Sequence, residues 1–425
     1  MVKRKSKKYT FDHINLQQLL CWAMEQSCFS FINGNEYQAR YGAFPQIIFA
    51  GKVVNVESNQ DSFNQLNELI NEQKDWLYGY FSYDLKNEIE DLTSNNPSTI
   101  SFSHMNFIVP ESILFINKNG FTISAYTEPD EVFQEIHGTK THEFNSINDV
   151  SKPVSRTTKK QYFEKIETIK KNIVEGEYYE MNYCIEYTAF SKKFDPLHCY
   201  LNLNKLSPMP FSSFMKLENK YLICASPERF LKKETEKLIS QPIKGTIKRS
   251  FDKNEDAQLK QALFTSEKER AENLMIVDLV RNDLAKSSIT GSVKVDELFG
   301  VYTFSKIHQM ISTVSSVHKK NISVPSIIKH AFPMGSMTGT PKIRVMQEIE
   351  DLEDSSRGLY SGAVGYFSPD QNFDLNVVIR SIIFDEQSGK LSFHVGSAIT
   401  YDSDPEHEYN ECLLKAESLF EVLSS

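Results

Sequence analysis

Cysteine is scarce in this sequence of 425 residues, and the cysteines lie far apart. None forms a Cys-x-x-Cys pair, and the spacing matches no zinc-ligand pattern. The histidines are equally scattered. These features exclude a disulfide framework and a structural zinc site, and they favour reduced, mostly buried thiols in a cytoplasmic protein. The six cysteines are Cys21, Cys28, Cys184, Cys199, Cys224 and Cys412.

Long apolar runs are also missing. The longest, such as residues 273–280, are interrupted by Asp or Glu well before the roughly 18 residues that a membrane span requires. Residues 3–8 are basic, but no apolar segment follows them. We therefore expect no signal peptide, a solvated N-terminal tail and no membrane partner.

Two nucleotide-binding signatures are absent. The sequence has no Gly-x-Gly-x-x-Gly, and residues 335–342 fail the P-loop pattern because Lys342 follows Pro341. This segment is expected to begin a helix that runs to about Asp351, with backbone N–H groups free to hold an anion. The net charge of −9, without a basic stripe, argues against a nucleic-acid partner.

The composition is that of a packed enzyme. Hydrophobic residues make up 40% of the chain, with 29 Phe and 19 Tyr. Strand-like segments in hairpin order and separate helical segments predict an α+β fold rather than a doubly wound parallel sheet. We expect a sheet-forming N-terminal region over residues 1–150, packed into the same unit as a catalytic region over residues 160–425, with a polar linker over residues 145–160.

Lys244 and Glu228 are candidates for chemistry. Lys244 lies in Pro-Ile-Lys-Gly-Thr (residues 242–246), and Glu228 follows a Ser-Pro turn at the end of an apolar strand. A desolvated lysine with a lowered pKa is a nucleophile, and a nearby carboxylic acid with a raised pKa can protonate a leaving hydroxyl. The alternative is a surface lysine in a turn and a helix-capping glutamate.

Two predicted helices, residues 265–286 and 406–422, carry glutamates three positions apart. Residues at this spacing share a helix face. Carboxylates from two helices suit Mg²⁺, which binds oxygen ligands and keeps several waters. The alternative is a solvated acidic face. The pairs are Glu269 with Glu272 and Glu408 with Glu411, the second followed one turn later by Lys415.

Three further side chains are open to two interpretations. His308 lies in an apolar segment, where a histidine is more often a core residue than a catalytic one. Arg380 ends a strand and either binds a carboxylate or is solvated. Tyr360 either donates a hydrogen bond or packs in the core.

Together these segments resemble the chorismate-utilising enzymes, a family that includes anthranilate synthase component I, aminodeoxychorismate synthase component I, isochorismate synthases and salicylate synthases. The motifs occur in the family's order over residues 160–425, with a weaker match at residues 79–85. They are residues 226–230 (Ser-Pro-Glu-Arg-Phe), 242–246, 270–279 (Arg-Ala-Glu-Asn-Leu-Met-Ile-Val-Asp-Leu), 281–284, 291–295, 335–342, 357–366 and 402–405.

The resemblance implies two antiparallel β-sheets packed orthogonally, with helices outside and chorismate bound with Mg²⁺ in a cleft. It places Glu272 and Glu411 on the metal, with Glu269 and Glu408 behind them. It implies that Glu228 is the general acid and that His308 lies near the ring. It assigns to the substrate site Tyr360, Arg380, Lys415, Thr338 with the backbone of Gly339, the loop at Gly396, and Glu180.

Within the family, a lysine at position 244 is typical of aminodeoxychorismate synthases, whereas anthranilate synthases have alanine. The implied role is attack on C2 of chorismate, with ammonia entering at C4. We see no glutaminase segment, so the resemblance implies a separate glutamine amidotransferase subunit. Anthranilate synthase component I and an inactive scaffold homologue are the alternatives.

The sequence departs from the family at three places. Glu180 replaces a glutamine, and isochorismate and salicylate synthases have their lysine base there, which argues against both. We expect Glu180 to accept a proton from Lys244 or to stabilise its ammonium. Residues 396–398 read Gly-Ser-Ala rather than Gly-Ala-Gly. The tryptophan-binding Leu-Leu-Glu-Ser signature is missing from the N-terminal region.

Overall fold

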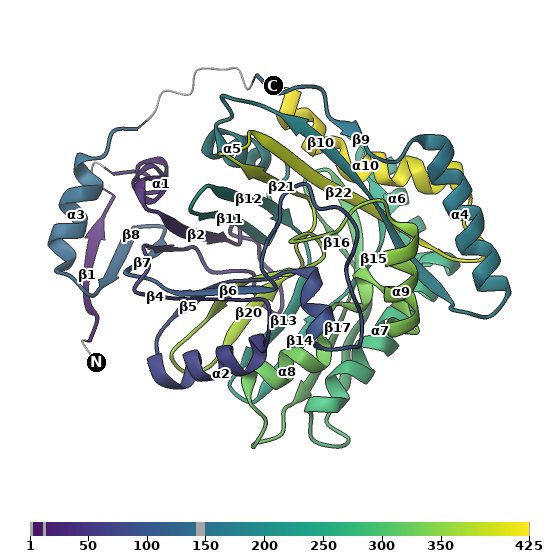
Figure 1. Cartoon of the computed structure of the whole chain (residues 1–425), viewed down its shortest axis with the longest axis horizontal. Coiled ribbons are helices and arrows are strands. Elements are labelled where there is room, and N and C mark those ends of the chain that lie inside the picture. The colour runs from purple at the N-terminus through teal and green to yellow at the C-terminus, as the bar shows by residue number, and fades with distance from the viewer. Residues whose placement is uncertain (1–2, 12–13, 142–148, 425) are drawn as a thin grey trace.

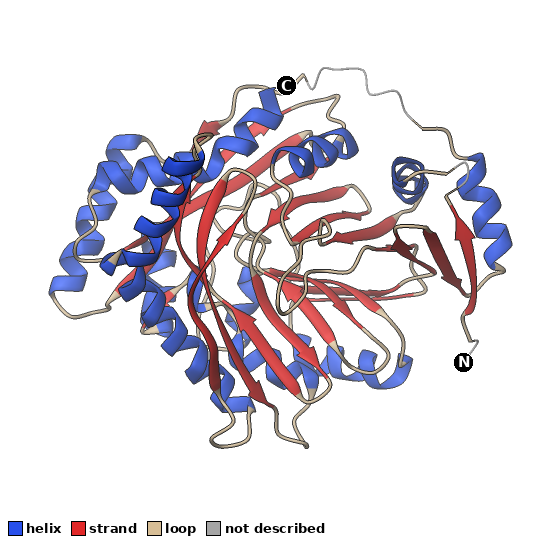
Figure 2. Cartoon of the chain, turned by 180° about the vertical axis from the view of Figure 1, so that it is seen from behind, coloured by secondary structure: helices blue, strands red, loops and turns tan. Residues whose placement is uncertain are grey.

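The computed structural model describes residues 3–11, 14–141 and 149–424, which form two antiparallel β-sheets with helices on the outside (Figures 1 and 2). The predicted α+β fold with two antiparallel sheets is confirmed. Residues 145–148 of the predicted polar linker, which covers residues 145–160, lie outside the described residues. None of the helices in the described part of the chain has the length and apolarity of a membrane-spanning segment.

The larger sheet contains twelve strands among the described residues. Its spatial order is β1 (Lys5–Thr10), β8 (Gly120–Ala125), β7 (Ser112–Asn117), β3 (Ile47–Ala50), β2 (Cys28–Asn33), β11 (Phe211–Leu217), β12 (Lys220–Ser226), β21 (Ser381–Asp385), β22 (Lys390–Ile399), β10 (Glu180–Phe190) and β18 (Gly339–Thr340), with β9 (Val154–Ser155) beside β10.

The second sheet contains ten strands among the described residues. Its spatial order is β15 (Ile243–Lys248), β17 (Ile307–Val317), β14 (Lys237–Gln241), β13 (Arg229–Glu234), β20 (Phe373–Asn376), β19 (Ala363–Phe367), β5 (Leu77–Phe81), β6 (Met105–Val109) and β4 (Val54–Ser58), with β16 (Lys294–Thr303) beside β17. Both sheets therefore combine strands from residues 1–150 with strands from residues 160–425.

The helices connect and cover these strands. They are α1 (Leu16–Glu25), α2 (Ser62–Gln73), α3 (Pro129–Gly138), α4 (Lys159–Val174), α5 (Pro196–Leu206), α6 (Lys253–Thr265), α7 (Glu267–Ser287), α8 (Val324–Ala331), α9 (Lys342–Leu352) and α10 (Pro405–Ser424), with 3-10 turns η1 (Tyr83–Glu88) and η2 (Gly335–Met337).

Separate apolar clusters fill the layers of the molecule. Residues of α1, α4, α5 and α10 pack against the larger sheet, and residues of α2, α7 and α8 pack against the second sheet. Between the sheets, Phe49 and Tyr78 stack with their rings 5.6 Å apart, and Met215 joins a cluster with Tyr80 and Val364. Burial of these faces is the main stabilising contribution to the fold.

The basic N-terminal segment is part of the larger sheet. Lys5 pairs with Ala125 and Thr10 with Gly120 along an edge strand of that sheet. The side chains of residues 5–8 are exposed, as expected of a solvated segment, but these residues are paired in β1 and do not form a tail. Strand pairing with a segment far along the chain leaves no local signal beyond alternation. Lysines along such an edge discourage pairing with another chain.

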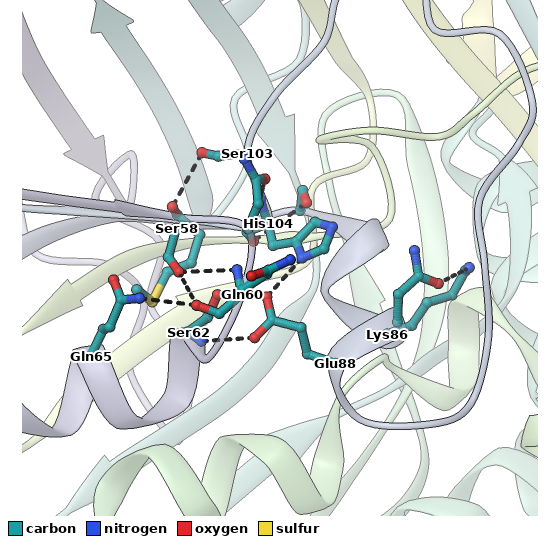
Figure 3. Close-up of polar contacts among 12 residues, drawn as sticks. Ser58, Gln60, Ser62, Gln65, Lys86, Glu88, Ser103 and His104 are labelled. Atoms are coloured by element: carbon teal, nitrogen blue, oxygen red, sulfur yellow. Dashed lines mark hydrogen bonds and ion pairs between the residues drawn. The ribbon is translucent and has the colours of Figure 1, made fainter.

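A charged network anchors α2, which in turn packs on α8 beside α7. The Glu88 carboxylate accepts bonds from the backbone N–H and the hydroxyl of Ser62, both at 2.7 Å, and it contacts Nδ1 of His104 at 2.7 Å (Figure 3). These partners outweigh the effect of burial and lower the pKa of Glu88. A carboxylate at a helix N-terminus satisfies N–H groups that the helix leaves free.

Candidate active site

A cavity between the two sheets, α7 and α10 collects most of the predicted site residues. They come from loops, strands and helices that are far apart in the sequence. Those that line it are Glu228, Lys244, Glu269, Glu272, Tyr360, Arg380, Gly396, Glu408, Glu411 and Lys415.

A β-bulge in β15 presents Lys244 to the cavity. Ile243 pairs with Ile311 and Thr246 with Gln309, so two residues of β15 lie opposite one residue of β17. Gly245 has φ +87°, and a Cβ on it would lie 2.8 Å from the Glu269 carboxylate. The left-handed backbone conformation therefore favours glycine here, and a side chain would also displace the Glu269 carboxylate. This explains the Lys-Gly pair physically.

Lys244 is buried among carboxylates. Its ammonium forms an ion pair with Glu180, the first residue of β10, and Glu272 is also near. Burial alone would lower the pKa of Lys244, but the two carboxylates outweigh it and raise the pKa. The expectation of a lowered pKa was therefore wrong for this structure, because the family resemblance indicated one acid near the amine, Glu180, and packing adds a second, Glu272. The second carboxylate oxygen of Glu180 has no hydrogen-bond partner.

Glu228 lies beside Lys244 in the loop between β12 and β13. Its carboxylate accepts a hydrogen bond from the Ser336 hydroxyl at 2.6 Å, and its backbone carbonyl accepts from the N–H of Val377 at 3.0 Å. Burial raises the pKa of Glu228 to about 7, although Ser336 and Lys244 oppose the shift. A buried carboxyl with this pKa holds its proton near neutral pH and can donate it.

The four predicted metal-site glutamates differ in their surroundings. Ser266 caps the start of α7, so Glu269 and Glu272 both lie near the N-terminal end of that helix. Burial raises the pKa of Glu272 to about 7, and its Oε1 has no hydrogen-bond partner. On α10, Glu408 accepts from the Ser403 hydroxyl at 2.9 Å and Glu411 pairs with Lys415 at 2.7 Å.

Within the described residues, the four glutamates do not form one tight ligand cluster. The group whose ligand atoms lie within 4.8 Å of one another is His407, Glu408 and Glu411. His407 was not predicted. The four glutamates still suit Mg²⁺, because they supply carboxylate oxygens and Oε1 of Glu272 is buried without a hydrogen-bond partner, 3.9 Å from the Lys268 ammonium.

Arg380 is a cation without an acidic partner in the described part of the chain. It lines the cavity, and burial lowers its pKa to about 10. Its φ of +51° is a left-handed conformation that is rare for a residue with a side chain. Strain of this kind persists where the surrounding structure imposes it, commonly at binding sites. An anionic ligand would supply the missing partner.

Tyr360 and His394 form a stacked pair in the cavity wall. Their ring centroids lie 5.1 Å apart, and the Cys184 thiol donates to the Tyr360 hydroxyl at 3.9 Å. Burial lowers the pKa of His394 to about 4, so its ring is neutral at physiological pH.

Four predicted site residues do not line the cavity: His308, Thr338, Gly339 and Glu180. His308 does not line the cavity: its ring contacts Asp256 at 3.0 Å and the Thr303 hydroxyl at 3.0 Å. The prediction that it lies near the reacting ring finds no support in this placement, because neighbouring residues of a strand face opposite sides and Gln309 takes the cavity side.

Thr338, Gly339 and Glu180 lie just behind the cavity wall. Thr338 accepts from the N–H of Asn182 through its carbonyl at 2.7 Å, and Gly339 pairs with Met181 across β18 and β10. The predicted helix after Gly335 begins only at Lys342, after η2 and β18. Glu180 reaches the site through Lys244.

Sequence reasoning missed several lining residues, among them Asn182, Lys268, Gln309, Ser336 and His394. Ser336 lies inside the glycine-rich segment at residues 335–342, so that motif is a local signal for it. Lys268 lies one residue from Glu269 and contacts Glu408 at 3.4 Å. Nothing local in the sequence indicates the other three.

Comparison with known proteins agrees with this architecture. The chorismate binding enzyme family matches residues 19–421. A protein named probable aminodeoxychorismate synthase from Oryza sativa subsp. japonica is 40% identical over 311 residues, covering 72% of this chain but only 32% of that protein. The chain thus spans about a third of the length of this relative.

Two further relatives, one bacterial and one archaeal, are matched over more of their own length. Aminodeoxychorismate synthase component 1 of Escherichia coli is 33% identical over 81% of this chain and 76% of its own. Anthranilate synthase component 1 of Saccharolobus solfataricus is 31% identical over 91% of each chain. Among solved structures, anthranilate synthase component I from Streptococcus pneumoniae has a TM-score of 0.78 at 24% identity, covering 91% of this chain and 95% of that one.

Proposed function

The chain belongs to the chorismate binding enzyme family, and from that premise we propose that it converts chorismate and ammonia to 4-amino-4-deoxychorismate. One observation carries the proposal: a buried lysine amine, Lys244, lies beside a carboxyl, Glu228, whose pKa is raised to about 7. A nucleophile and an acid in one cavity suit displacement of a hydroxyl. Relatives named aminodeoxychorismate synthase support this assignment.

The proposed reaction has two displacements. In the first, the neutral amine of Lys244 bonds to C2, both ring double bonds shift by one position so that one reaches C4, and the C4 hydroxyl leaves as water with the proton of Glu228. Glu180 accepts the proton that Lys244 must lose. In the second, ammonia bonds to C4, both double bonds shift back and the C2–nitrogen bond breaks; Glu180 returns its proton to the departing Lys244 amine, and the added nitrogen gives a proton to Glu228.

The substrate is a dianion, and the proposal places its carboxylates against the cations of the cavity. Arg380 has no acidic partner among the described residues, and Lys415 is shared between Glu411 and the Gly396 carbonyl, which lies 2.9 Å from its ammonium. Tyr360 offers a hydroxyl from the wall. Thr338 and Gly339 shape the backbone behind that wall. His308 has no role in this proposal.

Mg²⁺ is the proposed cofactor. Glu272 and Glu411 would hold it, with Glu269 and Glu408 behind them or acting through water. The Oε1 atom of Glu272 supports this choice: it is buried without a hydrogen-bond partner and lies 3.9 Å from the Lys268 ammonium, so a closer cation would stabilise it. When bound, the ion neutralises and orients a substrate carboxylate.

We further propose that ammonia comes from a glutamine amidotransferase subunit. Support comes from the name component 1, which the Escherichia coli relative carries. Binding of this partner is checked by mixing the chain with an amidotransferase subunit and testing whether glutamine replaces ammonium as the nitrogen source.

Anthranilate synthase is the second candidate, favoured by the Saccharolobus solfataricus relative that matches 91% of each chain. Supplying chorismate, Mg²⁺ and ammonium, then identifying the product by mass and fluorescence, separates the two. We expect aminodeoxychorismate. Fluorescent anthranilate would refute the first assignment, and no turnover with saturating ammonium would favour an inactive scaffold homologue.

A further inference from the structure

Gln309 places a buried hydrogen-bond acceptor in the cavity wall without a partner. The residue is 4% exposed and lines the cavity. Its amide nitrogen donates to the Thr246 hydroxyl at 3.2 Å, whereas Oε1 has no hydrogen-bond partner. Native proteins pair nearly all buried polar atoms, so an unpaired carbonyl in a ligand cavity indicates a ligand that donates to it.

The position of Gln309 relates it to the reacting amine. Gln309 lies opposite Thr246, at the edge of the bulge that presents Lys244. The Glu228 carboxylate lies at the other side of this bulge, where it meets the backbone N–H of Ile243. Gln309 and Lys244 thus lie on the paired strands β17 and β15 of the second sheet, and Glu228 lies in the loop that leads into β13 of the same sheet.

Ammonia needs an acceptor of a particular kind. It attacks only as neutral NH₃, with its lone pair free. A carboxylate favours ammonium, which has no lone pair, whereas a neutral amide oxygen accepts an N–H bond and takes no proton. Two neutral hydroxyls of the wall already have partners: the Ser336 hydroxyl donates to Glu228, and the Thr246 hydroxyl accepts from Gln309.

We propose that Oε1 of Gln309 binds the incoming ammonia and directs its lone pair toward C4 of the ring, with Thr246 fixing the orientation of the amide. This inference rests on the proposed function and names the binding position of its second substrate. The step is the second displacement described above, and Gln309 itself neither gains nor loses a proton.

The test is the kinetics of Gln309→Met with free ammonium as nitrogen source. Methionine has a similar shape but no acceptor. We expect the KM for ammonium to rise about tenfold, because one hydrogen bond to the ammonia is lost. The KM for chorismate should change by less than about twofold. Thr246→Val should raise the ammonium KM by about threefold, because the amide is kept but loses its orienting partner.

Gln241→Met is the matched control. Gln241 is also a buried glutamine of the second sheet, bonded to Arg229 and Thr313, and it does not line this cavity. We expect it to lower the melting temperature without changing the ammonium KM. If Gln309→Met does not fold, Gln309→Asn, which shortens the reach of the amide, should show the same selective rise.

The outcomes separate the two proposals. A wild-type chain that aminates chorismate, together with a folded Gln309→Met variant of unchanged ammonium dependence, overturns this inference alone. An equal rise in the KM for chorismate also overturns it, because Gln309 would then act on the ring substrate. A wild-type chain that forms no aminated product at saturating ammonium contradicts both the inference and the proposed function.

Discussion

Two groups of buried charge in this protein differ in how completely they are bonded. Arg229 makes a two-point pair with Asp374, at 2.8 and 2.9 Å, and donates further to Gln241 and two backbone carbonyls. Arg357 is held in the same way by Glu353, at 2.9 and 2.6 Å. Every charge in these pairs is matched within the protein.

The cavity shows the opposite pattern. Oxygens of Glu180, Glu272 and Gln309 have no hydrogen-bond partner, and Arg380 has no acidic partner in the described residues. Saturated pairs have nothing left to offer a ligand, so they serve the fold. Unsaturated groups carry a desolvation cost that a charged substrate and a metal would offset. The following predictions test this distinction.

The largest effect is expected from Lys244→Ala, which removes the proposed nucleophile and should lower amination by more than about 10³-fold. Lys244→Arg should be equally inactive, because a guanidinium does not deprotonate. Mass spectrometry of the quenched wild-type reaction should show an adduct on Lys244. Unchanged product formation by Lys244→Ala would refute the covalent route.

Glu228→Gln should lower kcat by about 10² to 10³-fold, since it removes the proton donor. In the proposed reaction Glu228 acts in its protonated form, and burial raises its pKa to about 7, so wild-type activity should fall as pH rises through about 7. The variant should lose this limb of the pH–rate profile. A profile that keeps the limb would assign it to another group.

Glu272→Ala should lower activity about 100-fold and abolish the dependence on Mg²⁺. Glu267→Ala is the control, because Glu267 lies on the same helix but is exposed. Rates measured during a magnesium titration after chelation distinguish the variants. Wild-type activity that survives full chelation would argue against the metal.

Arginine substitutions compare the two groups of charge directly. Arg229→Met leaves Asp374 buried and unpaired and should lower the free energy of unfolding by about 3–5 kcal/mol. Arg380→Met should change it by less than about 1 kcal/mol, yet raise the KM for chorismate about tenfold or more. Denaturant unfolding and initial rates provide both measurements, and equal losses of stability would contradict the distinction drawn here.

The smallest effect is expected from Glu180→Gln. Glu180 raises the pKa of Lys244, so removing the charge of Glu180 should lower that pKa. The increase in rate that accompanies deprotonation of Lys244 should then occur at lower pH. At the same time the variant loses its proton acceptor, so kcat should fall modestly. A pH–rate profile identical to that of the wild type would exclude this role for Glu180.

Local patterns in the sequence were sufficient to predict features that depend on interactions between residues close in the chain. The spacing of Glu269 and Glu272 places them on one helix face, and strand-like segments in hairpin order predict the antiparallel sheets. The Lys-Gly pair indicates a special backbone conformation, which the bulge supplies. The fold class and the family follow from ordered motifs of this kind.

The choice between His308 and Gln309 shows where such signals end. Both lie on β17, and alternation allows only one of them to face the cavity. Which one does depends on the pairing register with β15, including its bulge. A change of one residue in this register would turn His308 toward the cavity and Gln309 away from it. Both faces of β17 carry apolar residues, so the sequence does not indicate which face lines the cavity.

The sequence by itself determined the family, the antiparallel α+β architecture and the identity of the candidate lysine, because these depend on residue types at short spacing. Only the tertiary structure decided the full surroundings of that lysine, since the family resemblance indicated Glu180 but not Glu272. Glu180 meets Lys244 across 64 residues of chain, and Ser336 meets Glu228 across 108. Such contacts set the protonation of the site, and they arise from strand pairing and packing that no local pattern specifies.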